Sequence, residues 1–170
     1  MIYRDASFAD IYFTALNMRD RDFEEISAVS FCEDRESLAI EIGRVWSTSG
    51  NCLACCSNDG KPIAILNYVP IRPGVWSMGL FATNKIKQIG LSLTKLVCYD
   101  IIPALDRAKA HRVECHSIEG YDDVHRWLEF CGMRKESVIR KYGKNGEDFI
   151  NFAWVRGNMS IPFQTSSEVH

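Results

Sequence analysis

The chain has 170 residues, of which 46% are hydrophobic and 25% are charged, and its formal net charge is −2. This length and composition predict one compact domain with a hydrophobic core. The near-neutral charge lacks the basic excess typical of nucleic-acid binders, and no apolar run approaches the roughly 20 residues that cross a bilayer. We therefore expect a soluble, intracellular protein with no nucleic-acid partner and no membrane partner.

The seven cysteines are expected to be reduced thiols of the core, because their number is odd and most have apolar neighbours in the sequence. Cys52 and Cys55 have the spacing of half a zinc site. Neither a second cysteine pair nor a histidine pair at ligand spacing completes such a site. The sequence predicts no metal.

The N-terminal part predicts a short strand followed by two helices. Ser7 precedes apolar residues at helical spacing, and Asp10 stands where the acid of a capping box stabilises the first turn. After a polar run, apolar positions that include Leu38 and Ile42 mark a second helix, which ends before Gly50.

Three strands are predicted next. Residues 52–56 and 63–69 flank Asp59 and Gly60, a pair that suits the positive φ of a hairpin turn. Residues 75–83 read as the third strand, and two prolines and a glycine close the segment before it.

At residues 80–92 an apolar strand runs into a basic turn that contains Gly90 and then into an amphipathic helix, which Pro103 should kink or end. Unpaired N–H groups and the positive end of the macrodipole suit such a helix start to a diphosphate. The alternative is an ordinary strand-to-helix connection with a solvated pair of lysines, Lys85 and Lys87.

The C-terminal part predicts a strand, a helix and a hairpin, at residues 112–118, 121–131, 136–142 and 149–155. Gly132 is the expected cap of the helix, and Asn145-Gly146 is a strong turn signal. Residues 1–156 then form a single domain of class α+β, in which a mixed, mostly antiparallel sheet carries helices on both faces. Residues 157–170 are a polar C-terminal tail.

The element order resembles the GNAT (GCN5-related N-acetyltransferase) fold, whose pyrophosphate loop has the pattern R/Q-x-x-G-x-G/A. Residues 87–92 align with that loop, and residues 121–133 resemble the late helix of the family. The resemblance implies that acetyl-CoA is the cofactor if the chain is active. It implies cofactor contacts from the strand end and the loop, at Phe81, Ala82, Thr83, Lys87, Gln88, Ile89, Gly90, Leu91 and Ser92.

Several catalytic features of that family are absent. Leu128 stands where many members have the tyrosine that protonates the leaving thiolate, and residues 75–83 contain no carboxylate to act as a base. Glu114 and His116 alternate onto one face of the following strand and are the candidate catalytic residues if the chain is an enzyme. The alternative is that both are ordinary polar side chains on a half-exposed strand.

A charged run follows the first helix, and GNAT proteins often shape the acceptor cleft at this place. Its members are Arg19, Asp20, Arg21, Asp22, Glu24 and Glu25. The alternative interpretation is a solvated face whose charges pair with one another.

A second resemblance is to the internal virion protein A group of short-tailed phages. Residues 17–30, 59–64 and 75–78 carry it. It implies a structural, assembly or genome-delivery component of a phage virion, made in the host cytoplasm, with degraded catalytic equipment. Its partners would be other virion proteins or further copies of the chain, held through the tail or helix faces. The alternative function is an active acetyl-CoA-dependent N-acetyltransferase.

Overall fold

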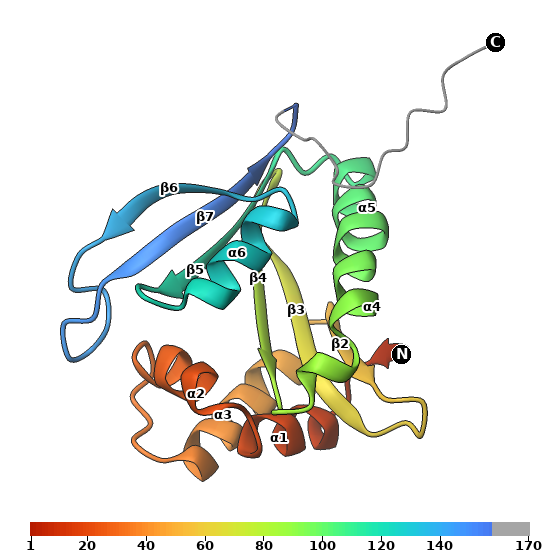
Figure 1. Cartoon of the computed structure of the whole chain (residues 1–170), viewed down its shortest axis with the longest axis vertical. Coiled ribbons are helices and arrows are strands. Elements are labelled where there is room, and N and C mark those ends of the chain that lie inside the picture. Colours follow the sequence, from red (N-terminus) through yellow and green to blue (C-terminus); the bar gives the residue numbers. More distant parts are fainter. Residues whose placement is uncertain (158–170) are drawn as a thin grey trace.

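The computed structural model describes residues 1–157, so the predicted tail lies, apart from Gly157, outside the described residues. One seven-stranded sheet has the order β1-β2-β3-β4-β5-β7-β6. Within residues 1–157, only β4 and β5 pair in parallel, and the other five neighbouring pairs are antiparallel. The α+β class with a mixed, mostly antiparallel sheet is thus confirmed (Figure 1).

The elements follow one another in this order: β1 Ile2–Asp5, α1 Phe8–Leu16, α2 Asp20–Ser27, α3 Arg35–Ser47, β2 Cys52–Cys56, β3 Pro62–Arg72, β4 Val75–Ala82, the 3₁₀ turn η1 Ile86–Gln88, α4 Gly90–Lys95, the π-helical η2 Leu96–Ile101, α5 Ile102–Arg107, β5 Arg112–Ile118, α6 Asp122–Phe130, β6 Arg134–Ile139 and β7 Phe149–Val155. None of the helices among residues 1–157 is long and apolar enough to cross a membrane.

Each face of the sheet has its own hydrophobic core. On one face α1 and α3 pack over Ala54, Ile65 and Phe81. On the other face the helix that begins with α4, together with α6, packs over residues that include Leu66 and Met78. Helices therefore cover both faces, because alternate residues of the central strands point to opposite sides.

The capping box at the first helix is confirmed, but the prediction of two helices before β2 is wrong. The Asp10 N–H donates to Ser7 Oγ at 3.2 Å, and the Asp10 carboxylate accepts from the Ser7 N–H at 3.0 Å. A third helix, α2, lies between the two expected ones. Only Phe23 and Ile26 are apolar among its eight residues, and tertiary contacts of its carboxylates hold it in place.

The helix after β4 does not end at Pro103. It continues from α4 through η2 into α5, and Figure 1 shows these segments as one column. In a π turn the hydrogen bonds run from residue i to residue i+5, and such turns are common where the ordinary ladder is interrupted. The distortion that Pro103 was expected to cause therefore takes the form of a wider turn.

The final hairpin is shorter than expected. The last β6–β7 pair is Ile139 with Phe149, so residues 140–148 form a loop that contains the Asn145-Gly146 turn. Strand pairing stops where Lys141 adopts the left-handed region at φ 52°. Gly132 has φ 89° and caps α6, as predicted.

Candidate active site

A cleft opens where β4 and β5 part. The two strands pair only from Val75 to Ser77 of β4. Beyond Ser77, β4 remains bound to β3 as far as Ala82, while β5 remains bound to β7, so the strands diverge towards α2 (Figure 1). The cleft has a volume of about 920 Å³, including the part open to solvent. Its walls come mainly from β4, β5, α2 and α6, with Leu80, Glu25, His116, Ser117, Trp127 and Leu128 among the lining residues.

Asp22 of α2 bridges the two sides of the cleft. Its Oδ2 accepts from the Ala82 N–H of β4 at 2.9 Å, and its Oδ1 accepts from the Tyr121 hydroxyl, next to α6, at 2.7 Å. The Arg19 guanidinium donates to both oxygens, at 3.0 and 2.8 Å. The Asp22 side chain is 4% exposed, so this is a buried carboxylate whose charge and hydrogen bonds are fully matched.

Glu25 lies one helical turn further along α2 and reaches β5. Its Oε2 accepts from the Ser117 hydroxyl at 2.7 Å and from the Ile118 N–H at 2.8 Å. Burial raises the pKa of the Glu25 carboxyl above its ordinary value, against the opposing effect of these two hydrogen bonds. Glu25 therefore ties α2 to β5 and keeps an ionisable group inside the cleft.

Of the two predicted catalytic residues, only His116 lines the cleft. Its ring makes an edge contact with the Tyr142 ring, 5.3 Å between centroids. Glu114 is held in ion pairs, with Arg112 at 2.5 Å and with Arg72 at 3.5 Å, and it is not among the residues that line the cleft. The structure therefore separates these side chains, although they share one face of β5.

The predicted phosphate loop forms the η1 turn and the first turn of α4. Lys87 and Gln88 lie in η1, and the N–H groups of Gly90, Leu91 and Ser92 belong to the first turn of α4, for which the helix itself supplies no acceptor and Ile89 at the N-cap offers no side-chain bond. A Cβ built on Gly90 would meet no atom within 4 Å, and Gly90 does not have a positive φ. Neither packing nor backbone conformation requires glycine here, so its effect is to leave the backbone at the start of α4 uncovered.

The predicted contacts at the end of β4 are less accessible. The Phe81 side chain is 0% exposed. The Ala82 N–H donates to Asp22 and its carbonyl accepts from the Arg19 N–H at 2.9 Å. The Thr83 N–H donates to the Ile63 carbonyl at 2.8 Å. The N–H groups of Ala82 and Thr83 are thus already used by the fold.

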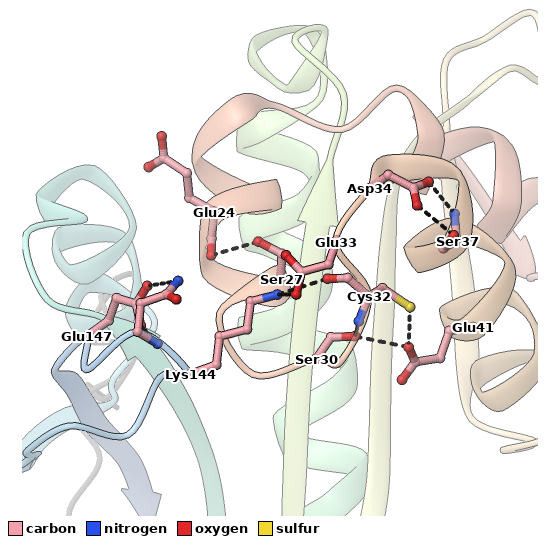
Figure 2. A network of polar contacts seen from close by, with 11 residues as sticks. Glu24, Ser27, Ser30, Cys32, Glu33, Asp34, Ser37, Glu41, Lys144 and Glu147 are labelled. Atoms are coloured by element: carbon pink, nitrogen blue, oxygen red, sulfur yellow. Dashed lines mark hydrogen bonds and ion pairs between the residues drawn. The ribbon is translucent and has the colours of Figure 1, made fainter.

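Two loops meet at the mouth of the cleft. The Lys144 N–H, in the β6–β7 loop, donates to the Ala28 carbonyl at 2.7 Å, and Lys144 Nζ donates to the Cys32 carbonyl at 2.9 Å. Figure 2 shows Lys144 reaching the α2–α3 loop, where Nζ also lies 3.3 Å from a Glu33 oxygen. The loop after α2 is therefore attached to the loop between β6 and β7, at one edge of the sheet.

The Glu25→Gln substitution is expected to stabilise the fold at neutral and alkaline pH. The amide oxygen can accept the same two hydrogen bonds, while the cost of burying a charge beside Asp22 disappears. Because the folded pKa is raised, the native carboxylate costs most above that pKa, and the cost disappears as the pH falls to the ordinary value of 4.5. The gain in the free energy of unfolding should therefore be present at pH 8 and absent at pH 4.

Denaturant unfolding of both proteins at several pH values measures this difference. Glu24→Gln is the matched control, because the Glu24 side chain is 53% exposed and pairs with Arg21 on the surface. A Glu25→Gln protein that is less stable than the native one at pH 8 would contradict the expectation.

Sequence reasoning placed Glu25 in the charged run but did not select it. Arg19, Asp22 and Glu25 recur every third residue, which places them on one face of a helix. That spacing is the signal that identifies an inward-facing charged stripe. It was missed because α2 itself was not predicted.

The splayed parallel pair, the helix start beside it and the sheet order together define the GNAT fold. The solved structures that this chain resembles include proteins named as members of the GNAT family. A ribosomal-protein-alanine N-acetyltransferase from Brucella melitensis is 15% identical, with a TM-score of 0.67 over 91% of this chain and 99% of that one. A GNAT-family acetyltransferase from Bacillus anthracis is 15% identical, with a TM-score of 0.69 over 90% and 93%.

A GCN5-related N-acetyltransferase from Kribbella flavida is 20% identical, with a TM-score of 0.66 over 91% of this chain and 96% of that one. No protein-family model matches the sequence, and no curated protein matches it either. The GNAT fold expected from the sequence is thereby confirmed, since identities this low support the fold and carry no reaction with them.

Proposed function

We propose that this protein transfers an acetyl group from acetyl-CoA to an amine in the β4–β5 cleft. One observation carries the proposal: the cleft contains an ionisable carboxylate, and the first turn of α4, whose N–H groups have no acceptor within that helix, is joined to the cleft through Thr94 and Trp127. The structurally similar proteins are named as acetyltransferases, which supports the same chemical class.

The residues of the phosphate loop fit the diphosphate of acetyl-CoA. The N–H groups of Gly90, Leu91 and Ser92 would hold it, since α4 itself supplies them with no acceptor, and Lys87 adds a cation on the preceding turn. When bound, acetyl-CoA supplies a thioester whose carbonyl carbon is open to attack by an amine.

The Leu80 N–H is the candidate donor to a developing oxyanion. The N–H groups of a strand alternate in direction. Because Thr83 donates to β3 and Ala82 donates to Asp22 on the opposite side, Leu80 points the same way as Ala82, into the cleft. A fixed backbone donor of this kind stabilises charge that forms during acyl transfer.

Trp127 lies between the phosphate loop and the cleft. Its Nε1 donates to Thr94 Oγ1 at 2.9 Å, and that hydroxyl donates to the Gly90 carbonyl at 2.8 Å. These two hydrogen bonds join α6 to the first turn of α4. A ligand that spans from the loop to the cleft must therefore pass Trp127, and this side chain would set how readily such a ligand enters.

Acetyl-CoA is expected to bind the native protein, and Gly90→Asp is expected to weaken binding at least about tenfold. A carboxylate at the helix start places a negative charge where the diphosphate would lie, and tenfold corresponds to only about 1.4 kcal/mol. Isothermal titration calorimetry gives both dissociation constants. Leu91→Ala is the control, since Leu91 is 65% exposed and alanine keeps its N–H. If millimolar acetyl-CoA gives no binding signal with the native protein, the proposal fails.

The assignment to a phage virion, with other virion proteins or copies of the chain as partners, rests on the sequence resemblance and stays a prediction. The predicted association between copies of the chain can be tested by light scattering across a concentration series.

A further inference from the structure

Two buried cysteines meet where α6 packs against the helical column of α4, η2 and α5 (Figure 1). Cys98 lies in η2 and Cys131 is the C-cap residue of α6, and each is 3% exposed within the same hydrophobic core. Both are free thiols, and their side chains share a hydrogen bond. The two thiols are therefore in contact, although the whole of β5 separates them in the chain.

The packing of the two helices explains this contact. Trp127 Nε1 of α6 donates to Thr94 Oγ1 of α4 at 2.9 Å. Cys131 follows Trp127 by four residues, and its N–H donates to the Trp127 carbonyl at 2.9 Å, which keeps it on the last turn of α6. Cys98 follows Thr94 by four residues on the other helix. Each cysteine thus lies about one turn beyond one partner of the Trp127–Thr94 bond, on the faces where the helices meet.

The cysteine pair that stands out by its spacing in the sequence is arranged differently. Cys52 and Cys55 both belong to β2, but Cys52 packs in the core beneath α1 and α3 and Cys55 packs in the opposite core. Residues three apart in a strand point to opposite faces, so these thiols face away from each other. Cys115, which lies on β5, donates to Met133 Sδ at 3.6 Å.

We propose that Cys98 and Cys131 form a reversible disulfide bond when a small-molecule disulfide oxidises the folded protein. The Cys98 thiolate attacks one sulfur of the reagent and releases one thiolate from it. The Cys131 thiolate then attacks the Cys98 sulfur of the mixed disulfide and releases the second. The protein loses two protons and two electrons and gains one S–S bond, while the S–S bond of the reagent is reduced to two thiols. This inference does not depend on the proposed acetyl transfer.

The hydrogen bond between the two thiols favours Cys98 as the attacking group. It lowers the pKa of the Cys98 thiol and raises the pKa of the Cys131 thiol, because it stabilises a thiolate at Cys98. The thiolate is the species that attacks a disulfide. Both side chains are almost fully buried, so the reagent reaches them when α6 moves away from the column, and oxidation of the native protein should be slow.

The bond would clamp α6 to the helical column that begins with the candidate phosphate loop. It would also close a loop of the chain that contains β5 and α6. A disulfide restricts the unfolded chain, and the effect on stability grows with the length of the closed loop. For a domain of this size we expect the oxidised protein to have a Tm about 5–15 °C above that of the reduced protein.

Peptide mapping after oxidation tests the proposal on the native protein. The folded protein is incubated with excess oxidised glutathione, its remaining thiols are alkylated, and mass spectrometry without reduction identifies linked peptides. We expect a peptide pair that joins Cys98 to Cys131 and a raised Tm in differential scanning calorimetry, both reversed by dithiothreitol. Recovery of the two cysteines as separate peptides would overturn the proposal. A linked protein whose Tm is no higher would overturn the clamp.

Cys115→Ala is the matched control, because it removes a thiol from the same region and should keep both the link and the rise in Tm. Cys98→Ala and Cys131→Ala should each abolish the rise that oxidised glutathione causes. A rise that persists in either variant, or a link from Cys115 to Cys131 in the native protein, would contradict the assignment. If an alanine variant does not fold, the peptide map of the native protein decides alone.

Discussion

Replacement of Asp22 by alanine is expected to lower the free energy of unfolding by about 3–5 kcal/mol, the usual cost of breaking a buried ion pair. The substitution leaves the Ala82 N–H and the Tyr121 hydroxyl without their acceptor and Arg19 without its counter-ion. For a domain of this size, each kcal/mol corresponds to about 2–4 °C in Tm, so a fall of roughly 10 °C is expected.

Thermal and urea unfolding measure this effect. Glu24→Ala removes a neighbouring carboxylate on the same helix, but the Arg21–Glu24 pair is exposed on both sides, so the change there should stay within about 0.5 kcal/mol. A loss below 1 kcal/mol for Asp22→Ala would show that α2 is not anchored through this carboxylate.

Phe81→Ala is expected to cost about 3–5 kcal/mol, because it removes a fully buried aromatic ring and leaves a cavity. The ring is 0% exposed, lies 5.2 Å from the Trp46 ring between centroids and packs beneath α1 and α3. Since Phe81 belongs to β4, the loss should loosen both the core of this face and the strand that forms one wall of the cleft.

Denaturant unfolding gives the free energy, and Phe31→Ala is the control, since Phe31 is fully exposed. That variant should remain within about 0.5 kcal/mol of the native protein. Comparable losses for the two variants would mean that the packing around Phe81 contributes little to stability.

The two predictions bear on the cleft from opposite sides. Asp22 connects α2 to the end of β4 and to the residue that precedes α6, while Phe81 supports β4 from behind. Both variants should therefore be examined for binding of acetyl-CoA below their unfolding temperatures. A protein that keeps its fold but loses binding would show that the separation of β4 and β5 must be held rigidly.

Local patterns predicted the strands well. Residues 112–118 are a strand with the bounds expected from the sequence, and the hairpin around Asp59-Gly60 is present. These signals are local, because alternation and turn chemistry depend only on neighbouring residues. The helix after β4 does not end at Pro103, which a π turn precedes. Strand β6 ends earlier than the pattern predicts, two residues before the left-handed Lys141.

The candidate site was predictable only in part. The candidate phosphate loop and Gly90 form a contiguous motif, so the sequence alone could propose them, and their binding role stays a prediction. Glu25 was not selected, because its significance depends on contacts with Ser117 and Ile118, more than 90 residues away in the chain. Glu114 was selected because of the alternation of side chains along β5. That pattern does not reveal that Glu114 forms ion pairs with Arg72 and Arg112.

The sequence by itself determined the α+β class, the element order after β2, the capping box at Ser7 and the cap at Gly132, because each depends on interactions between residues close in the chain. Only the tertiary structure decided which carboxylates enter the cleft and which of them are neutralised. That outcome depends on where β4 and β5 part and on how α2 packs across the gap. Long-range packing sets both, and the energy of a buried charge is determined by the partners that packing brings to it.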